Sequence, residues 1–265
     1  MTARPQPVLQ ARNLALSYPG AAAVDFEGVD LDLSHGEVVA VLGASGAGKS
    51  SLLRVLAGLQ PASAGTLLME GVPLTGVHPR VAVAFQDPSL LPWLSLERNV
   101  AFGLDFKHQP ALTDAQRRAR VAQAIDEVGL AQARHLRPAQ LSGGMAQRTA
   151  LARCLARQPS VLLLDEPFGA LDEVTRGEMQ ALLRKVVADF QTAAVLITHD
   201  IDEALLLADR IVLLGGAPGR ILGVWQVDLP PPRADLLPEM GALRLEILTR
   251  LRAALRDARG TAVLA

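Results

Sequence analysis

The chain has 265 residues, and its 26 basic and 27 acidic side chains leave a formal net charge of −1. This balance excludes the strongly basic surface with which nucleic-acid-binding proteins hold phosphates, so no nucleic-acid partner is expected. Half of the residues are hydrophobic, yet no run reaches the roughly 20 apolar residues that a membrane-spanning helix needs. The single cysteine, Cys154, excludes an internal disulfide and fits a reducing compartment. The N-terminus lacks the apolar stretch of a signal peptide, so we expect a cytoplasmic chain.

The hydrophobic pattern of the first third of the chain changes at Glu37. Residues 8–34 alternate loosely between apolar and polar positions, which predicts half-exposed antiparallel strands. Residues 38–42 form a continuous apolar run, which predicts a buried strand that leads through a glycine-rich turn into a helix over 49–58. A further strand is predicted over 81–85, before a turn rich in proline.

The middle of the chain, over residues 95–157, is predicted to be mostly helical, and Thr113 and Gln116 have the spacing of a capping box. Strands and helices then alternate, which is typical of an α/β core. Strands are predicted at 161–164, 193–197, 211–214 and 221–227, and helices at 178–190 and 202–208. This order predicts one domain over residues 8–227 with a helical subdomain at about 95–157.

Residues 228–265 are predicted to form a proline-rich linker, marked by prolines at 230–232, and a C-terminal amphipathic helix. Its apolar side chains recur at steps of three and four residues, which places them on one helical face. They are Met240, Leu243, Ile247, Leu251 and Leu255. Two interpretations are open: the helix packs on its own domain with a solvated basic side, or it lies on a membrane surface. We favour the first.

A phosphate-binding loop is indicated by residues 43–50, which fit the pattern Gly-x-x-x-x-Gly-Lys-Ser/Thr in full. Glycines let successive backbone N–H groups turn toward one centre at the start of a helix, and this arrangement binds anions. We expect Lys49 to place its charge between the β- and γ-phosphates and the Ser50 hydroxyl to coordinate Mg²⁺. The expected nucleotide-binding residues of this loop are Gly43, Ala44, Ser45, Gly46, Ala47, Gly48, Lys49, Ser50 and Ser51.

Phosphoryl transfer also needs a carboxylate linked to the metal and a group that activates water. The apolar run at 161–164 ends in Asp165 and Glu166, which offer both. We expect Asp165 to hold Mg²⁺ through its hydration shell and Glu166 to polarise the attacking water as a general base. Taken alone, such an acidic pair could be a strand cap; beside a phosphate loop, it predicts hydrolysis of a nucleoside triphosphate.

Residues 141–148 read Leu-Ser-Gly-Gly-Met-Ala-Gln-Arg, another glycine-rich helix start that can receive a phosphate. This peptide resembles the Leu-Ser-Gly-Gly-Gln signature of the ABC ATPase family, and the resemblance covers about residues 8–227. It implies an α/β P-loop NTPase core with an N-terminal antiparallel β-subdomain and an inserted α-helical signature subdomain. It also implies that Ser142, Gly143 and Gly144 close over ATP bound by a second copy in a head-to-tail dimer.

The same resemblance implies roles for four further residues. Tyr18 matches the aromatic residue that stacks on adenine, although core packing is the alternative. Gln86 matches the glutamine that touches Mg²⁺ and senses the membrane partner. Asp172 matches the loop through which the two subunits communicate. His199 matches the histidine that contacts the γ-phosphate and positions the general base.

Met145 occupies the position of the usual signature glutamine, and this variant resembles the branch of importers for nitrate, sulfonates and taurine. Stretches at 85–93, 99–103, 198–204 and 218–221 are similar to the same branch. The resemblance implies an ATPase on the cytoplasmic face of the inner membrane. It would act with permease subunits and, indirectly, with an extracytoplasmic substrate-binding protein.

Residues 90–94 form an apolar stretch suited to docking on the permease, with core packing as the alternative. The alternative function is that of an ATPase subunit of an exporter for lipids or drugs, which differs chiefly in its permease.

Overall fold

The computed structural model describes residues 7–262 except 19, 21–23, 231, 234–235 and 237–238. Pro231, one of the three predicted linker prolines, therefore lies outside the described residues. The chain forms two compact units, a first unit made of residues 1–77 and 193–265 and a second unit made of residues 78–192. The domain boundaries expected from the sequence stay predictions. In the described part of the chain, no helix is both long enough and apolar enough to span a membrane.

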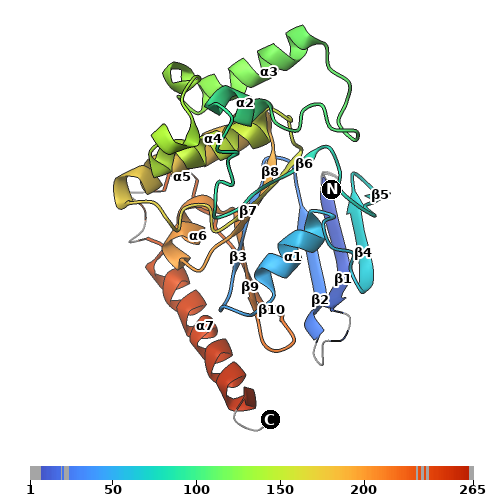
Figure 1. Ribbon diagram of the computed structural model, residues 1–265. Helices are drawn as coiled ribbons and strands as arrows, with labels where there is room; N and C mark the ends of the chain where they lie inside the picture. The colour runs from blue at the N-terminus through green and yellow to red at the C-terminus, as the bar shows by residue number, and fades with distance from the viewer. Residues whose placement is uncertain are drawn as a thin grey trace, which may run out of the picture. The chain divides into compact units, whose positions relative to one another are not determined.

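An antiparallel sheet in the first unit contains the N-terminal strands (Figure 1). Its order is β2 (Val24–Leu33), β1 (Leu9–Ser17), β4 (Ala64–Met69) and β5 (Val72–Pro73). The first two strands were predicted, whereas β4 and β5 were missed. The β4–β5 hairpin turns at Glu70 and Gly71, with φ of 51° and 80°. Two consecutive positive φ angles are the geometry of a type I′ turn, but Glu-Gly is not among its usual sequence signals.

A second sheet segment of the first unit holds the buried strands in the order β10 (Arg220–Gln226), β9 (Arg210–Gly215), β3 (Val38–Leu42) and β8 (Ala193–Ile197). Strand β3 runs parallel to both neighbours, and its Val41 lies opposite Ile197 of β8 and Val212 of β9. Every residue of β3 and β8 is buried, which explains their continuous apolar sequences. Because β3, β8 and β9 run parallel, their carboxyl ends lie at the same edge of the sheet.

Among its described residues, the first unit has three α-helices: α1 (Lys49–Leu56), α6 (Ile201–Leu207) and α7 (Gly241–Ala262). The C-terminal helix α7 packs on α6, β9 and β10. Met240, at its N-terminal side, and Ile247 are buried, whereas Leu255 is 36% exposed. The apolar face predicted for this helix is thus covered over its first turns by its own unit.

The second unit contains a parallel pair of strands and four α-helices. Strands β6 (Val81–Ala84) and β7 (Val161–Asp165) pair with Ala84 opposite Leu164. The helices are α2 (Leu96–Ala101), α3 (Asp114–Glu127), α4 (Gly143–Leu155) and α5 (Glu173–Phe190), with short 3-10 turns at Ala131–Ala133 and Pro138–Gln140. The predicted capping box at Thr113 and Gln116 is formed. The predicted α/β fold class, with an antiparallel start and helices between residues 95 and 157, is confirmed.

Candidate functional site

The loop at residues 43–48 joins the buried strand β3 to helix α1, and two of its features require glycine. A Cβ atom on Gly43 would lie 2.2 Å from the carbonyl oxygen of Leu214 in β9, so no other residue fits without moving backbone. Gly46 and Gly48 have φ of 80° and 85°, in the left-handed region that L side chains rarely adopt. The glycines predicted from the motif are therefore demanded by packing at one position and by backbone conformation at two others.

The ammonium group of Lys49 is held inside this loop. Its side chain is 9% exposed, and its Nζ donates hydrogen bonds to the carbonyl oxygens of Gly43 (2.8 Å) and Ala44 (3.0 Å). An ammonium group carries three donors on a flexible stem, so it can exchange a carbonyl for a phosphate oxygen without leaving the loop. The positive charge lies at the N-terminus of α1, where backbone N–H groups also favour an anion.

Gly219 packs against the phosphate loop, a role that the sequence did not indicate. Its N–H donates to the Asp25 carbonyl (2.9 Å), and its own carbonyl accepts from the Glu27 N–H (2.9 Å). A Cβ on Gly219 would lie 2.4 Å from the carbonyl oxygen of Ala47. The β9–β10 hairpin and β2 therefore fix the second half of the loop, through contacts far apart in sequence.

Tyr18 lies beside the start of α1. Its hydroxyl is 3.2 Å from the Ser51 Oγ, and the residue is 37% exposed. This exposure does not fit the core-packing alternative. The aromatic ring is therefore available at the phosphate loop, as an adenine-stacking role would require.

His199 follows β8 at the same strand edge as the loop. The Thr198 N–H donates to the Val41 carbonyl in β3 (3.3 Å), so the two strand ends are tied together just before His199 and Gly43. The His199 side chain is exposed. The first unit thus brings together Tyr18, the phosphate loop and His199.

Gln86, Asp165 and Glu166 meet in the second unit, because β6 and β7 end side by side. The Gln86 amide nitrogen lies next to Gly169, where a Cβ would be 3.4 Å away. Gln147 of α4 donates from its Nε2 to the Gln86 carbonyl (2.6 Å) and is 5% exposed. Gln147 thereby positions the segment after β6, a role that its place in the signature peptide did not reveal.

Glu166 has a strained backbone, with φ of 46°. A residue with a Cβ in the left-handed region costs about 1–2 kcal/mol, and such residues concentrate at functional positions. The Gly169 N–H donates to the Glu166 carbonyl (3.3 Å), which closes a turn around the strained residue. The predicted general base is therefore held in one backbone conformation directly after β7.

The signature peptide forms the N-terminus of α4. Ser142 caps the helix by accepting a hydrogen bond from the Met145 N–H (3.2 Å). Gly143 is exposed, with open space where a Cβ would stand, whereas a Cβ on Gly144 would meet the Thr175 side chain of α5 at 2.5 Å. An ion pair between Arg148 and Glu178 also joins α4 to α5. Met145 contributes to the cap through its backbone N–H, a contact that does not involve its side chain.

Asp172 caps α5 by accepting a hydrogen bond from the Thr175 N–H (3.0 Å). This bond stabilises the ionised carboxylate and lowers the pKa of Asp172 below its usual value. The cap also explains why α5 begins at Glu173, five residues before the predicted start. Asp172 is exposed and carries a negative charge at neutral pH.

Magnesium bound with ATP needs few ligands from the protein, because phosphate oxygens and water complete its octahedral shell. The residues that the structure describes contain no group of three His, Cys, Asp or Glu side chains that could hold a metal by themselves. Of the predicted ligands, Ser50 lies in the first unit, and Gln86 and Asp165 lie together in the second. Their oxygen atoms are of the hard type that Mg²⁺ prefers.

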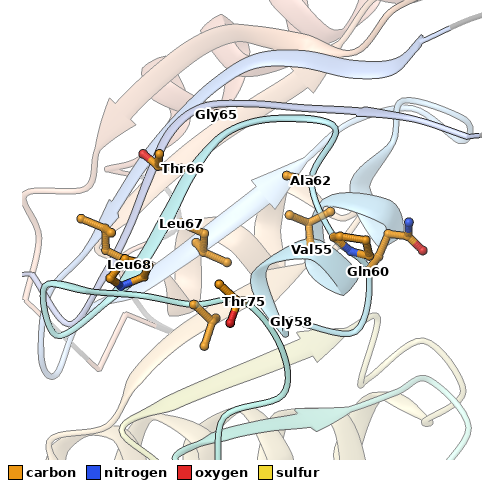
Figure 2. Close-up of a pocket in the computed structure, with 12 residues that line it drawn as sticks. Val55, Gly58, Gln60, Ala62, Gly65, Thr66, Leu67, Leu68 and Thr75 are labelled. Atoms are coloured by element: carbon orange, nitrogen blue, oxygen red, sulfur yellow. The ribbon is translucent and has the colours of Figure 1, made fainter.

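A hollow of about 340 Å³ lies near the C-terminal end of α1 in the first unit, away from the phosphate loop at the helix N-terminus (Figure 2). Val55 and Gly58 contribute from the α1 side, and Leu67, Leu68 and Thr75 from β4 and the residues after β5. Its lining has no ionisable side chain. It therefore offers no ionisable group for acid–base chemistry.

The strand–glycine loop–helix unit, with a buried lysine at the helix start, defines a P-loop nucleotide-binding protein. The model of the ABC transporter family matches residues 26–169 of the chain. The chain therefore belongs to the ABC transporter family.

Relatives with assigned roles refine this placement. The chain is 48% identical over 216 residues to an aliphatic sulfonates import ATP-binding protein of Xanthomonas axonopodis pv. citri, with 82% of this chain and 84% of that protein covered. It is 45% identical over 234 residues to a bicarbonate transport ATP-binding protein of Synechocystis, with 86% of this chain but only 35% of that protein covered. The chain thus spans about a third of the bicarbonate relative. Both relatives are named as ATP-binding proteins of import or transport systems, and these likenesses do not favour the exporter alternative.

Solved structures agree with the family and the fold. An ABC transporter subunit of Clostridium perfringens superposes with a TM-score of 0.77 at 26% identity, over 94% of this chain and 98% of that one. A dimeric ATP-binding cassette in a post-hydrolysis state, bound to ADP and phosphate, superposes with a TM-score of 0.71 at 28% identity, over 84% of this chain and all of that one. The predicted fold class and family are both confirmed.

Proposed function

We propose that the chain hydrolyses ATP with Mg²⁺ at sites shared between two copies, and that this drives uptake of a small solute through a permease. The observation that carries the proposal is the phosphate loop, in which Gly43 cannot carry a side chain and Lys49 is buried with its charge directed at the loop carbonyls. Such a loop binds the phosphates of a nucleotide through backbone N–H groups and one cation.

Within each site, Lys49 holds the phosphates and His199 contacts the γ-phosphate. Glu166, fixed in its strained conformation after β7, accepts the proton of the attacking water. Ser50, Gln86 and Asp165 would hold Mg²⁺, which neutralises charge on the phosphate oxygens when it is bound. Tyr18 stacks on the adenine ring.

Two copies would complete the sites. The exposed N-terminus of α4, with Ser142 at its cap and open space beside Gly143, is suited to meet the γ-phosphate held by the other copy. The exposed Asp172 at the start of α5 lies at the turn through which the copies would communicate. Solved relatives described as dimeric cassettes support this arrangement.

The docking surface for the permease would include Trp93, which is 67% exposed and therefore does not fit the core-packing alternative. The segment that carries it is held in shape by the buried Asn99. The Asn99 Oδ1 accepts from the Leu91 N–H (2.8 Å), and its Nδ2 donates to the carbonyls of Leu91 and Leu94 (both 3.2 Å). A rigid loop with an exposed tryptophan is typical of an interface anchor.

The transported solute would be nitrate, a sulfonate, taurine or a similar small solute, and the relatives named above are an aliphatic sulfonates import protein and a bicarbonate transport protein. The chain would act at the cytoplasmic face of the inner membrane. An extracytoplasmic binding protein would deliver the solute to the permease.

The test is phosphate release from ATP by the purified chain and three variants. Glu166→Gln is expected to bind ATP with wild-type affinity and to release phosphate at least about a hundredfold more slowly, since a general base contributes on the order of 10²–10⁴. Lys49→Ala is expected to weaken ATP binding. Glu97→Gln, an exposed glutamate of the same unit, is the matched control and keeps the wild-type rate. Wild-type hydrolysis by Glu166→Gln would refute the assignment of the base.

A further inference from the structure

Helix α6 begins two residues after His199, so its first turn sets the position of that histidine. Asp200 caps the helix by accepting from the N–H groups of Asp202 (2.8 Å) and Glu203 (3.2 Å). The Asp200 N–H in turn donates to the Thr198 hydroxyl (3.0 Å). His199 therefore lies between the hydrogen-bonded end of β8 and the capped start of α6. A shift of α6 would move His199.

The C-terminal helix α7 forms an ion pair with the first turn of α6. Arg244 donates to both carboxylate oxygens of Asp202, from Nη2 to Oδ2 at 3.0 Å and from Nε to Oδ1. Two parallel bonds between a guanidinium and a carboxylate fix orientation as well as distance. The two helices lie side by side where α7 starts (Figure 1).

Arg233, from the segment before α7, forms hydrogen bonds with the C-terminal end of α6. It is 3% exposed, and its Nη1 donates to the carbonyls of Leu205 (3.2 Å) and Ala208, the last groups of the helix. Its Nη2 donates to the Val227 carbonyl (3.2 Å) and its Nε to the Leu229 carbonyl (2.6 Å). A cation at a helix C-terminus satisfies carbonyls that have no partner within the helix.

We propose that the C-terminal segment sets the position of His199 by holding α6 at both ends, and that Arg244 is a positioning residue for the γ-phosphate contact. The proposal rests on the proposed role of His199 in ATP hydrolysis.

Stability alone does not account for the Arg244–Asp202 pair. Its side chains are 48% and 40% exposed, and exposed ion pairs add little to the free energy of folding. Helix α7 is already held to its unit by the buried Met240 and Ile247. What the pair adds is a defined direction for the first turn of α6, two residues from His199.

The experiment measures kcat and KM for ATP and the melting temperature of the full chain. Arg244→Gln is expected to lower kcat at least about threefold, since small displacements of a catalytic contact have large effects on rate, with KM and melting temperature unchanged. Arg250→Gln, an exposed arginine on the same helix, is the control and keeps the wild-type kcat. In a His199→Ala background, Arg244→Gln is expected to leave the residual rate unchanged, because the residue acts through His199.

An unchanged kcat in Arg244→Gln would overturn the inference, as would the same fold loss with and without His199. If His199→Ala itself keeps the wild-type kcat, the proposed role of His199 fails as well. A loss of kcat on His199→Ala without one on Arg244→Gln leaves the proposed function standing and refutes the positioning role alone.

Discussion

Replacing Gly43 by alanine tests the fit between the phosphate loop and the strand beside it. The added Cβ would lie 2.2 Å from the Leu214 carbonyl oxygen, and ordinary van der Waals contact begins at 3.4 Å. Because the neighbour is the backbone of the buried strand β9, it cannot rotate away. The loop or the strand must therefore move by about 1 Å, and such overpacking costs about 1–3 kcal/mol of folding free energy.

The displacement would also misplace the Gly43 carbonyl that holds Lys49, so ATP affinity should fall at least about tenfold. Chemical denaturation would measure the first effect and titration with a fluorescent ATP analogue the second. Gly76→Ala is the matched control, because open space surrounds the site of its Cβ. Wild-type stability and affinity in Gly43→Ala would refute the claim that this contact shapes the loop.

Three further outcomes follow from the structure. Burial raises the pKa of the Cys154 thiol to about 11, so a thiol reagent at pH 8 should label it only after denaturation; rapid labelling of the native chain would contradict this. Gly177 lies exposed in the interior of α5, with open space at its Cβ position. Gly177→Ala should therefore raise the free energy of unfolding by about 0.5–1 kcal/mol, measured by urea titration. A decrease in the free energy of unfolding would contradict this. Trp93→Ala should keep the ATPase rate of the isolated chain and lose association with permease-containing membranes, measured by sedimentation; retained association would remove Trp93 from the interface.

The strands β3 and β8 could be predicted to the residue because both faces of each are buried, so that only apolar side chains are allowed. The β4–β5 hairpin could not, because its short strands are largely exposed and carry no alternating pattern. Helix α5 begins five residues before its predicted start for a local reason, because the Asp172 side chain caps the helix.

The chemical motifs were visible in the sequence because phosphate binding demands particular residues at fixed spacing. Their supports were not, because each depends on contacts between distant segments. Gly219 reaches the loop from the β9–β10 hairpin, Gln147 holds the carbonyl of Gln86, and Arg244 reaches Asp202 across 42 residues. Chain folding, rather than local pattern, brings these residues to the site.

The measurement that tests the central claim most directly is the mass of Glu166→Gln in solution, determined by light scattering with ATP and with ADP. Sites shared between two copies predict a dimer in ATP, since the signature at Ser142 can close only on a γ-phosphate, and a monomer in ADP. Adding Ser142→Arg should abolish the ATP-dependent dimer. A monomer in both nucleotides, or a dimer that ignores the γ-phosphate, would contradict the account.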